Sequence, residues 1–154
     1  MHRLRRARLR PQRLFMQFHG GVYRSDDAGE SWTDIGAPLP SDFGFPLALD
    51  PADPDSAYLI PLTGAEDRVT PGGCVRVYET RDAGASWTAR GDGLPGHDAY
   101  LTILRQAFDR AGEGHALELY FGATSGEVFG SRDAGASWFV AATRLPPVYS
   151  VTAR

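Results

Sequence analysis

Acidic side chains of the kind used in glycoside cleavage are scattered through the turn-rich parts of the chain. Most enzymes that hydrolyse a glycosidic bond place two carboxyl groups beside it, one as acid and one as nucleophile or base, and a few use a tyrosine nucleophile. The candidate catalytic residues are Asp42, Glu66, Asp67, Asp98 and Tyr149. No spacing selects a pair among them, so the sequence leaves the catalytic residues unknown.

Aromatic and charged side chains accompany these acids, mainly in residues 36–45, 63–73 and 92–100. Such a mixture suits a polar ligand such as a carbohydrate. The candidate ligand-binding rim consists of Phe43, Phe45, Arg68, His97, Tyr100 and Arg105. The alternative interpretation is ordinary solvated loop polarity. The four histidines show no metal-ligand spacing, so no metal site and no cofactor are predicted.

Charge is unevenly distributed along the chain. All 16 basic residues are arginines, and six of them lie in residues 1–13, which leaves ten against 19 acidic residues. This acidic body would repel phosphate backbones, so we expect no nucleic-acid partner. No apolar run reaches the roughly 18 residues of a membrane span, so no membrane partner is expected either. The single cysteine excludes an internal disulfide and favours the cytoplasm, but it does not identify the compartment.

The basic start, residues 1–13, has no apolar stretch after its charges, as a signal peptide would need. We predict a disordered, solvated terminus or a start placed inside a longer reading frame. An arm that neutralises phosphates is the alternative. The folded part is expected to span residues 14–154.

An eight-residue motif ending in tryptophan occurs three times, and its tryptophans are 55 and then 51 residues apart. A valine–aromatic pair ends nine residues before each tryptophan, and a leucine–proline pair ends eight residues after it. The motifs are residues 25–32, 80–87 and 131–138. Three landmarks in one constant register identify a repeat protein.

Each motif predicts a β-hairpin, because Asp-Ala-Gly is a turn signal and it lies between short runs rich in aromatic and β-branched residues. Twelve strands at a period near 50 residues are typical of four-stranded propeller blades. Residues 100–110 would also suit a helix by composition, but their place in the repeat favours a strand. Beyond the hairpins, strands are expected at residues 14–18, 46–50, 57–62, 100–104, 117–121 and 148–152. The blade parts are residues 14–45, 46–99 and 100–147, followed by a closing strand within 148–153.

The repeated motif resembles the Asp-box, or bacterial neuraminidase repeat, of sialidases and related β-propellers. Its structural positions are Ser25, Asp27, Gly29 and Trp32; Thr80, Asp82, Gly84 and Trp87; and Ser131, Asp133, Gly135 and Trp138. Further segments resemble the C-terminal part of bacterial sialidase-like glycosyl hydrolases and BNR-repeat proteins: residues 19–25, 41–46, 71–73, 75–78 and 120–122. The resemblance implies an all-β propeller of four-stranded antiparallel blades, of which this chain holds about three, or half a propeller.

The same resemblance bears on the site. It implies that the Asp-box turns are structural, that they lie on the side away from any active site, and that their tryptophans pack between blades. It also suggests a sialidase-type tyrosine nucleophile, Tyr100 or Tyr149, with an arginine cluster drawn from Arg68, Arg76 and Arg105 to bind a sugar carboxylate. However, the Phe/Tyr-Arg-x-Pro segment that supplies the first sialidase arginine is missing from the sequence.

We therefore expect a non-catalytic scaffold that binds a carbohydrate or a protein partner. The alternative is a sialidase-like glycoside hydrolase, of the exo-alpha-sialidase type, whose site needs the missing half or a second copy. Three blades do not close a ring, because closed propellers typically have four to eight. Either the chain belongs to a longer protein, or two copies form a six-bladed homodimer. In that dimer, residues 148–152 of one copy are expected to pair with residues 14–18 of the other.

Overall fold

The computed structural model describes residues 3–154; Met1 and His2 of the predicted disordered start lie outside the described residues. Within 3–154 the chain is nearly all β, with two single-turn 3-10 helices, η1 (Pro71–Gly73) and η2 (Gly114–Ala116). The strands are β1 (Arg3–Arg6), β2 (Leu14–Phe18), β3 (Gly21–Ser25), β4 (Thr33–Asp34), β5 (Gly44–Leu49), β6 (Ala57–Pro61), β7 (Val77–Thr80), β8 (Thr88–Arg90), β9 (Phe108–Ala111), β10 (Glu118–Gly122), β11 (Val128–Ser131) and β12 (Phe139–Ala142). None of the helices in this part of the chain has the length and hydrophobicity to span a membrane.

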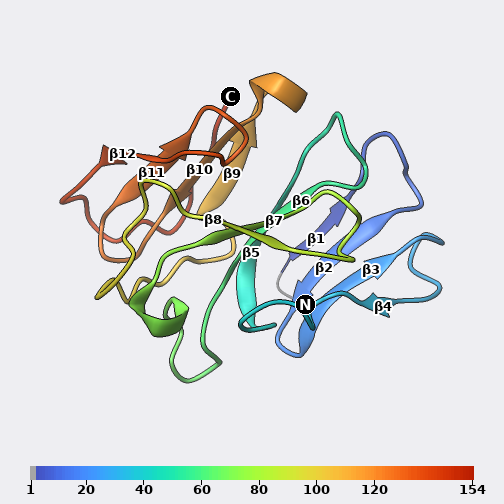
Figure 1. Ribbon diagram of the computed structural model, residues 1–154, viewed down its shortest axis with the longest axis horizontal. Coiled ribbons are helices and arrows are strands. Elements are labelled where there is room, and N and C mark those ends of the chain that lie inside the picture. The colour runs from blue at the N-terminus through green and yellow to red at the C-terminus, as the bar shows by residue number, and fades with distance from the viewer. Residues whose placement is uncertain (1–2) are drawn as a thin grey trace.

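The strands form three four-stranded antiparallel sheets, each built from consecutive strands. They are the first blade (β1–β4), the second blade (β5–β8) and the third blade (β9–β12), and Figure 1 shows them side by side in chain order. Strand β5 contacts both β1 and β9, so the first strand of each blade faces the same axis. The protein is thus three blades of a β-propeller, as the repeat predicts.

The prediction of a disordered basic start is wrong for residues 3–6. Arg3–Arg6 is not disordered; it forms β1 and pairs with β2, with Leu4 opposite Met16. Its alternating half-buried and exposed residues follow the two-residue period of a strand. Strand β1 occupies the edge beside Leu14–Phe18, so the predicted strand exchange with residues 148–152 of another copy is wrong. Those residues form no strand and make one isolated bridge, between Gln106 and Ser150.

The first strand of the third blade is also placed differently from the prediction. It is β9, and residues 100–104 form the connection that leads to it. Their backbone groups bond to other loops: the Thr70 N–H donates to the Leu101 carbonyl, and the Thr124 N–H to the Thr102 carbonyl, both at 3.0 Å. Ile103 is buried in the core. Residues 100–104 can therefore form a partly buried connection instead of a strand, because their backbone groups form hydrogen bonds to neighbouring loops and not to another strand.

The three repeat turns, residues 25–32, 80–87 and 131–138, are closed by the same side-chain bonds. In the third turn, the Ser131 hydroxyl donates to Asp133 at 2.7 Å and accepts the Gly135 N–H at 2.8 Å. Asp133 also accepts the Ser137 N–H at 2.9 Å. The same bonds recur in the other two turns. Each Asp is therefore fully used in holding its own turn.

These bonds lower the pKa of the turn carboxyl groups. Hydrogen bonds from Ser31 hold the pKa of Asp27 at about 2, and bonds from Ser86 hold that of Asp82 at about 2, against an ordinary value of 3.8. A lowered folded-state pKa contributes stability above the unfolded-state value, and that contribution disappears as the folded-state value is approached. These two turns should therefore lose stability between about pH 4 and pH 2.

We predict that an Asp27→Asn, Asp82→Asn double variant is less stable than the wild type at pH 7, and that most of this difference is lost by pH 2 and the rest by about pH 1, below both pKa values. Protonated aspartate and asparagine are both uncharged, so the two proteins should converge in acid. Urea unfolding at several pH values measures the difference. A gap that stays constant from pH 7 to pH 2 would contradict the role given to the charged carboxylates.

The core lies between the blades. Trp138, only 6% exposed, packs with Phe121 in the cluster between the second and third blades. Trp87 packs in the cluster between the first and second blades, and its Nε1–H donates to the Ile35 carbonyl at 2.8 Å. Trp32 is 36% exposed and belongs to neither cluster. The expected packing between blades thus holds for two of the three tryptophans.

Candidate functional site

The two ends of the blades differ in character. At one end, each repeat turn is bonded to a neighbouring segment through its alanine N–H, as from Ala83 to the Asp55 carbonyl at 2.9 Å. At the other end, which we call the loop face, the connections 62–76, 91–107 and 123–127 meet. The Thr102 hydroxyl, for example, donates to the Arg68 carbonyl at 2.7 Å. The loop face carries most of the predicted site residues.

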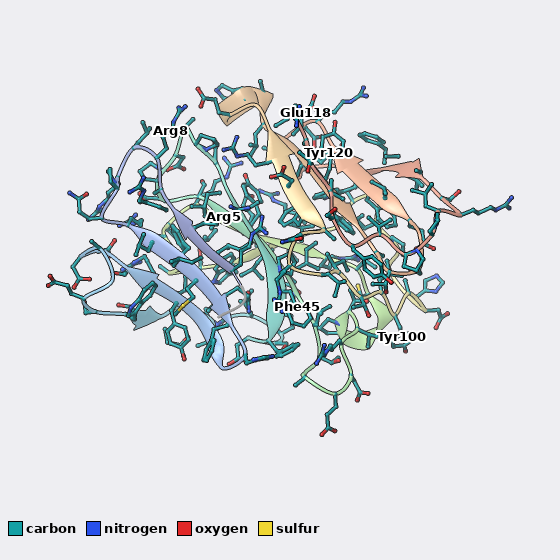
Figure 2. The ribbon with its side chains drawn as sticks, turned by 180° about the vertical axis from the view of Figure 1, so that it is seen from behind. Arg5, Arg8, Phe45, Tyr100, Glu118 and Tyr120 are labelled. Atoms are coloured by element: carbon teal, nitrogen blue, oxygen red, sulfur yellow. The ribbon has the colours of Figure 1, made fainter. Side chains whose placement is uncertain are left out.

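Phe45 organises one part of the loop face. The guanidinium carbons of Arg68 and Arg105 lie 5.7 Å and 5.9 Å from the centre of its ring, within cation–π range. Phe43 packs edge-on against Phe45 with ring centres 5.4 Å apart. Both phenylalanine side chains are buried, and Phe45 lies inside the molecule in Figure 2. Four of the predicted rim residues therefore come together, but neither phenylalanine presents an open ring face.

Tyr100, in contrast, is 60% exposed. A Cβ atom added to Gly73 would lie 2.9 Å from the Tyr100 ring, so the ring lies directly on the glycine backbone. The Ala99 N–H donates to the Gly73 carbonyl at 2.9 Å and holds the two segments together. Figure 2 shows Tyr100 at the periphery of the molecule, beside η1. One side of the ring is thus supported, and the side chain remains open to solvent.

His97 and Asp98 adjoin Tyr100 in the same connection. The His97 Nδ1 and Asp98 Oδ2 atoms are 3.1 Å apart, and both side chains are almost fully exposed. The Asp98 backbone has a φ of 53°, in the left-handed region that aspartate adopts more readily than most residues. Tyr100, His97 and Asp98 with Gly73 make up the Tyr100 patch, which combines an exposed ring with polar groups beside it.

The remaining candidate catalytic residues are dispersed. Asp42 lies in the connection after β4, where its carbonyl accepts the Gln17 side-chain amide at 2.8 Å. Glu66 and Asp67 line a shallow hollow of about 270 Å³ at the tip of the loop after β6. Tyr149 is exposed in the segment after β12. Within residues 3–154 no hydrogen bond joins any two of the candidate carboxyl groups.

Sequence analysis missed a polar cavity along the inner strands. About 390 Å³ in volume, it is lined by residues of β1, β5 and β9, among them Arg5, Arg6, Asp109 and Arg110. Burial lowers the pKa of Arg5. The negative charge of Asp109 acts in the opposite direction, and the positive charge of Arg110 lowers this pKa further. Arginines can bind a carboxylate through paired hydrogen bonds. Arg5 was missed because its segment was interpreted as disordered.

A buried tyrosine–glutamate pair was also missed. The Tyr58 hydroxyl donates to Glu79 at 3.0 Å, and Arg81 and Arg90 each donate to the same carboxylate at 2.7 Å. Burial, followed by the charge of Glu79, raises the pKa of Tyr58. A nucleophile needs the opposite shift. The pair therefore bonds strands β6, β7 and β8 together within the second blade.

Metal ligation finds no support among residues 3–154, where no three His, Cys, Asp or Glu side chains come together in a way that could hold an ion.

Known structures similar to this chain in fold belong to large propeller enzymes. They include the GH74 xyloglucanase from Xanthomonas campestris (24% identity, TM-score 0.65, covering 88% of this chain and 20% of that chain), an ancestral GH74 enzyme (14%, 0.63, 89% and 18%) and a GH74 enzyme from Niastella koreensis (19%, 0.60, 93% and 18%). This chain spans about a fifth of the length of each, and the similarity concerns the fold. No protein-family model and no curated protein matches the sequence.

Proposed function

We propose that this chain is a non-catalytic Asp-box propeller module that binds a carbohydrate chain through the Tyr100 patch. The observation that carries the proposal is the exposed Tyr100 ring lying on the backbone of Gly73. A ring supported on one side loses little freedom when a sugar ring packs on its open side. The exposed His97 and Asp98 side chains supply a donor and an acceptor for sugar hydroxyls.

Two features support a binding role in place of hydrolysis. The candidate carboxyl groups Asp42, Glu66 and Asp98 come from different connections and do not interact with one another. Hydrolysis needs one carboxyl group with a raised pKa as the acid, whereas the turn residues Asp27 and Asp82 have lowered values.

The test is binding to soluble xyloglucan, chosen because one structural neighbour is a xyloglucanase. Affinity electrophoresis and calorimetry should show binding by the wild type. We expect about a fivefold or greater loss in Tyr100→Ala, taking the about 1–3 kcal/mol of a base stacked on one aromatic ring as the guide for a sugar ring, and near-wild-type binding in Tyr100→Phe. Leu9→Ala is the control, because Leu9 is equally exposed, at 60%, in the turn between β1 and β2.

Unchanged binding in Tyr100→Ala would contradict the assignment of the patch. Failure of the wild type on xyloglucan and on a panel of other neutral glycans would contradict carbohydrate binding itself and leave a protein partner as the remaining class.

A sialidase-like hydrolase is the second candidate, favoured by the cavity that Arg5, Arg6 and Arg110 line. Those guanidinium groups suit the carboxylate of a sialoside. Release of the fluorescent group from a sialoside substrate would establish this activity, and its loss in Arg110→Ala would place the activity in the cavity. Binding of neutral glycans without any such release supports the module.

A further inference from the structure

The two interfaces inside the chain show how one blade contacts the next. The repeat turn of the following blade packs on the preceding blade. Ala83 accepts a hydrogen bond from Arg24 at 2.7 Å. A Cβ atom on Gly84 would lie 2.6 Å from the Ile35 side chain. At the next interface, the Trp138 N–H donates to the Asp92 carbonyl at 2.8 Å. Each interface therefore has an inserting half, with the turn and tryptophan, and a receiving half on the sheet before it.

The first blade leaves its inserting half uncovered. Among residues 3–154, the atoms within 4 Å of the Gly29 Cβ position belong to Leu14 and Trp32 of the same blade. Trp32 is 36% exposed, whereas Trp138 in the same repeat position is 6% exposed. Leu4, Met16 and Leu14 share this sheet face by alternation, and all are half-buried or exposed. Together they form an apolar surface of the type that other blades bury.

The third blade leaves only the outer part of its receiving half uncovered. The segment after β12 lies over the inner part: a Cβ atom on Gly122 would overlap Val148, and the Ala153 N–H donates to Asp109 at 3.1 Å. Three aromatic residues occupy equivalent positions in the three blades: Phe15, Tyr58 and Tyr120. Each lies on the second strand of its blade, opposite the residue that immediately precedes the repeat turn. Phe15 and Tyr58 are fully buried, but Tyr120 is only partly covered. Tyr120 packs edge-on with Phe139, which is 37% exposed on the same face. Figure 2 shows Tyr120 and Glu118 close together on the third blade, and the Tyr120 hydroxyl donates to Glu118 at 2.6 Å.

We propose that a second copy of this chain covers both surfaces, in a head-to-tail dimer that closes a six-bladed ring. Each copy has one inserting half and one receiving half, so two copies can form two identical interfaces with each other. Contacts of this heterologous kind close into a ring when the rotation per subunit completes a circle. Six blades fall within the four to eight of closed propellers. In this dimer the faces of the sheets pack against each other, and no strand is exchanged, because β1 pairs with β2 of its own chain.

The test is the mass in solution by light scattering after size exclusion. The wild type should have twice the chain mass of 16.7 kDa. Trp32→Arg changes only the inserting half and Phe139→Glu only the receiving half, so each variant alone should be monomeric. Leu9→Arg should remain dimeric, because Leu9 is an exposed apolar residue in the β1–β2 turn, outside both surfaces. Circular dichroism should show the same fold in all four proteins.

Mixing provides the sharpest outcome. An equimolar mixture of Trp32→Arg and Phe139→Glu retains one wild-type interface and should form a heterodimer at higher concentration than the wild type needs. A contact between two identical faces would not be restored by mixing, and such a result would overturn the head-to-tail arrangement. A wild-type monomer at all concentrations would overturn the proposal and assign the two surfaces to other blades. A series of growing oligomers would overturn ring closure.

Discussion

Trp138→Ala is expected to lower the free energy of unfolding by about 3–5 kcal/mol, the usual cost of removing a buried tryptophan. Trp138 packs against Phe121 and is almost completely covered. Its removal leaves a cavity between the second and third blades that the paired strands cannot collapse to fill. Trp32→Ala makes the same chemical change in the first repeat and should cost about 1 kcal/mol or less, because the side chain is already partly in solvent.

Both substitutions are best measured by urea unfolding in the Phe139→Glu background, so that association does not contribute to stability. Trp32 and Trp138 are the same residue type at the same position of the repeat. They differ in that Trp138 is covered by the preceding blade, whereas Trp32 is partly exposed. Equal losses at the two positions would show that the tryptophans act within their own turns and not between blades. A loss confined to Trp138 supports the packing described above.

Gly93→Ala is expected to destabilise the protein by about 2–5 kcal/mol, the sum of left-handed strain and overpacking. Gly93 has a φ of 84°, and a Cβ atom there would lie 2.1 Å from the Trp138 carbonyl oxygen. The oxygen is a backbone atom and the Cβ atom is fixed rigidly to the backbone, so neither can move aside as a flexible side chain would. Separating them breaks the bond from the Trp138 N–H to the Asp92 carbonyl.

Gly72→Ala is the matched control. Gly72 has a φ of 62°, but no atom of the described residues 3–154 lies within 4 Å of its Cβ position. It should show only the conformational cost, about 1 kcal/mol. Thermal unfolding followed by tryptophan fluorescence measures both variants. A Gly93→Ala protein as stable as Gly72→Ala would mean that the second and third blades do not approach as closely as described.

The fold was predictable because much of its pattern is local. The turn at residues 131–138 closes through its own Ser131, Asp133 and Ser137, so three residue types at fixed spacing specify it. Recurrence of that turn with its flanking strands determines the number of blades. Strand β1 was missed because its basic residues resemble a solvated charge run, and only pairing with the distant β2 makes it a strand.

The site was predictable only in part. The exposed Tyr100 and the grouping of Arg68 with Arg105 agree with residues chosen from the loops. Sequence analysis placed Phe45 in a loop, whereas it lies in β5 and is covered because it packs in a cluster with Leu62 and beside Leu104. The inner cavity depends on Arg5 and Arg110, which meet only through the packing of first strands from different blades.

The middle position of the second blade gives it a distinct kinetic role. It borders both apolar clusters, whereas the first and third blades each border one. Opening an outer blade therefore breaks one interface, and opening the second breaks two. In a repeat array of this kind, fluctuations begin at the ends and spread inward. We therefore expect the amide hydrogens of β6 and β7 to be the last to exchange with solvent in the monomeric Phe139→Glu variant, where the outer blades have no second copy against them.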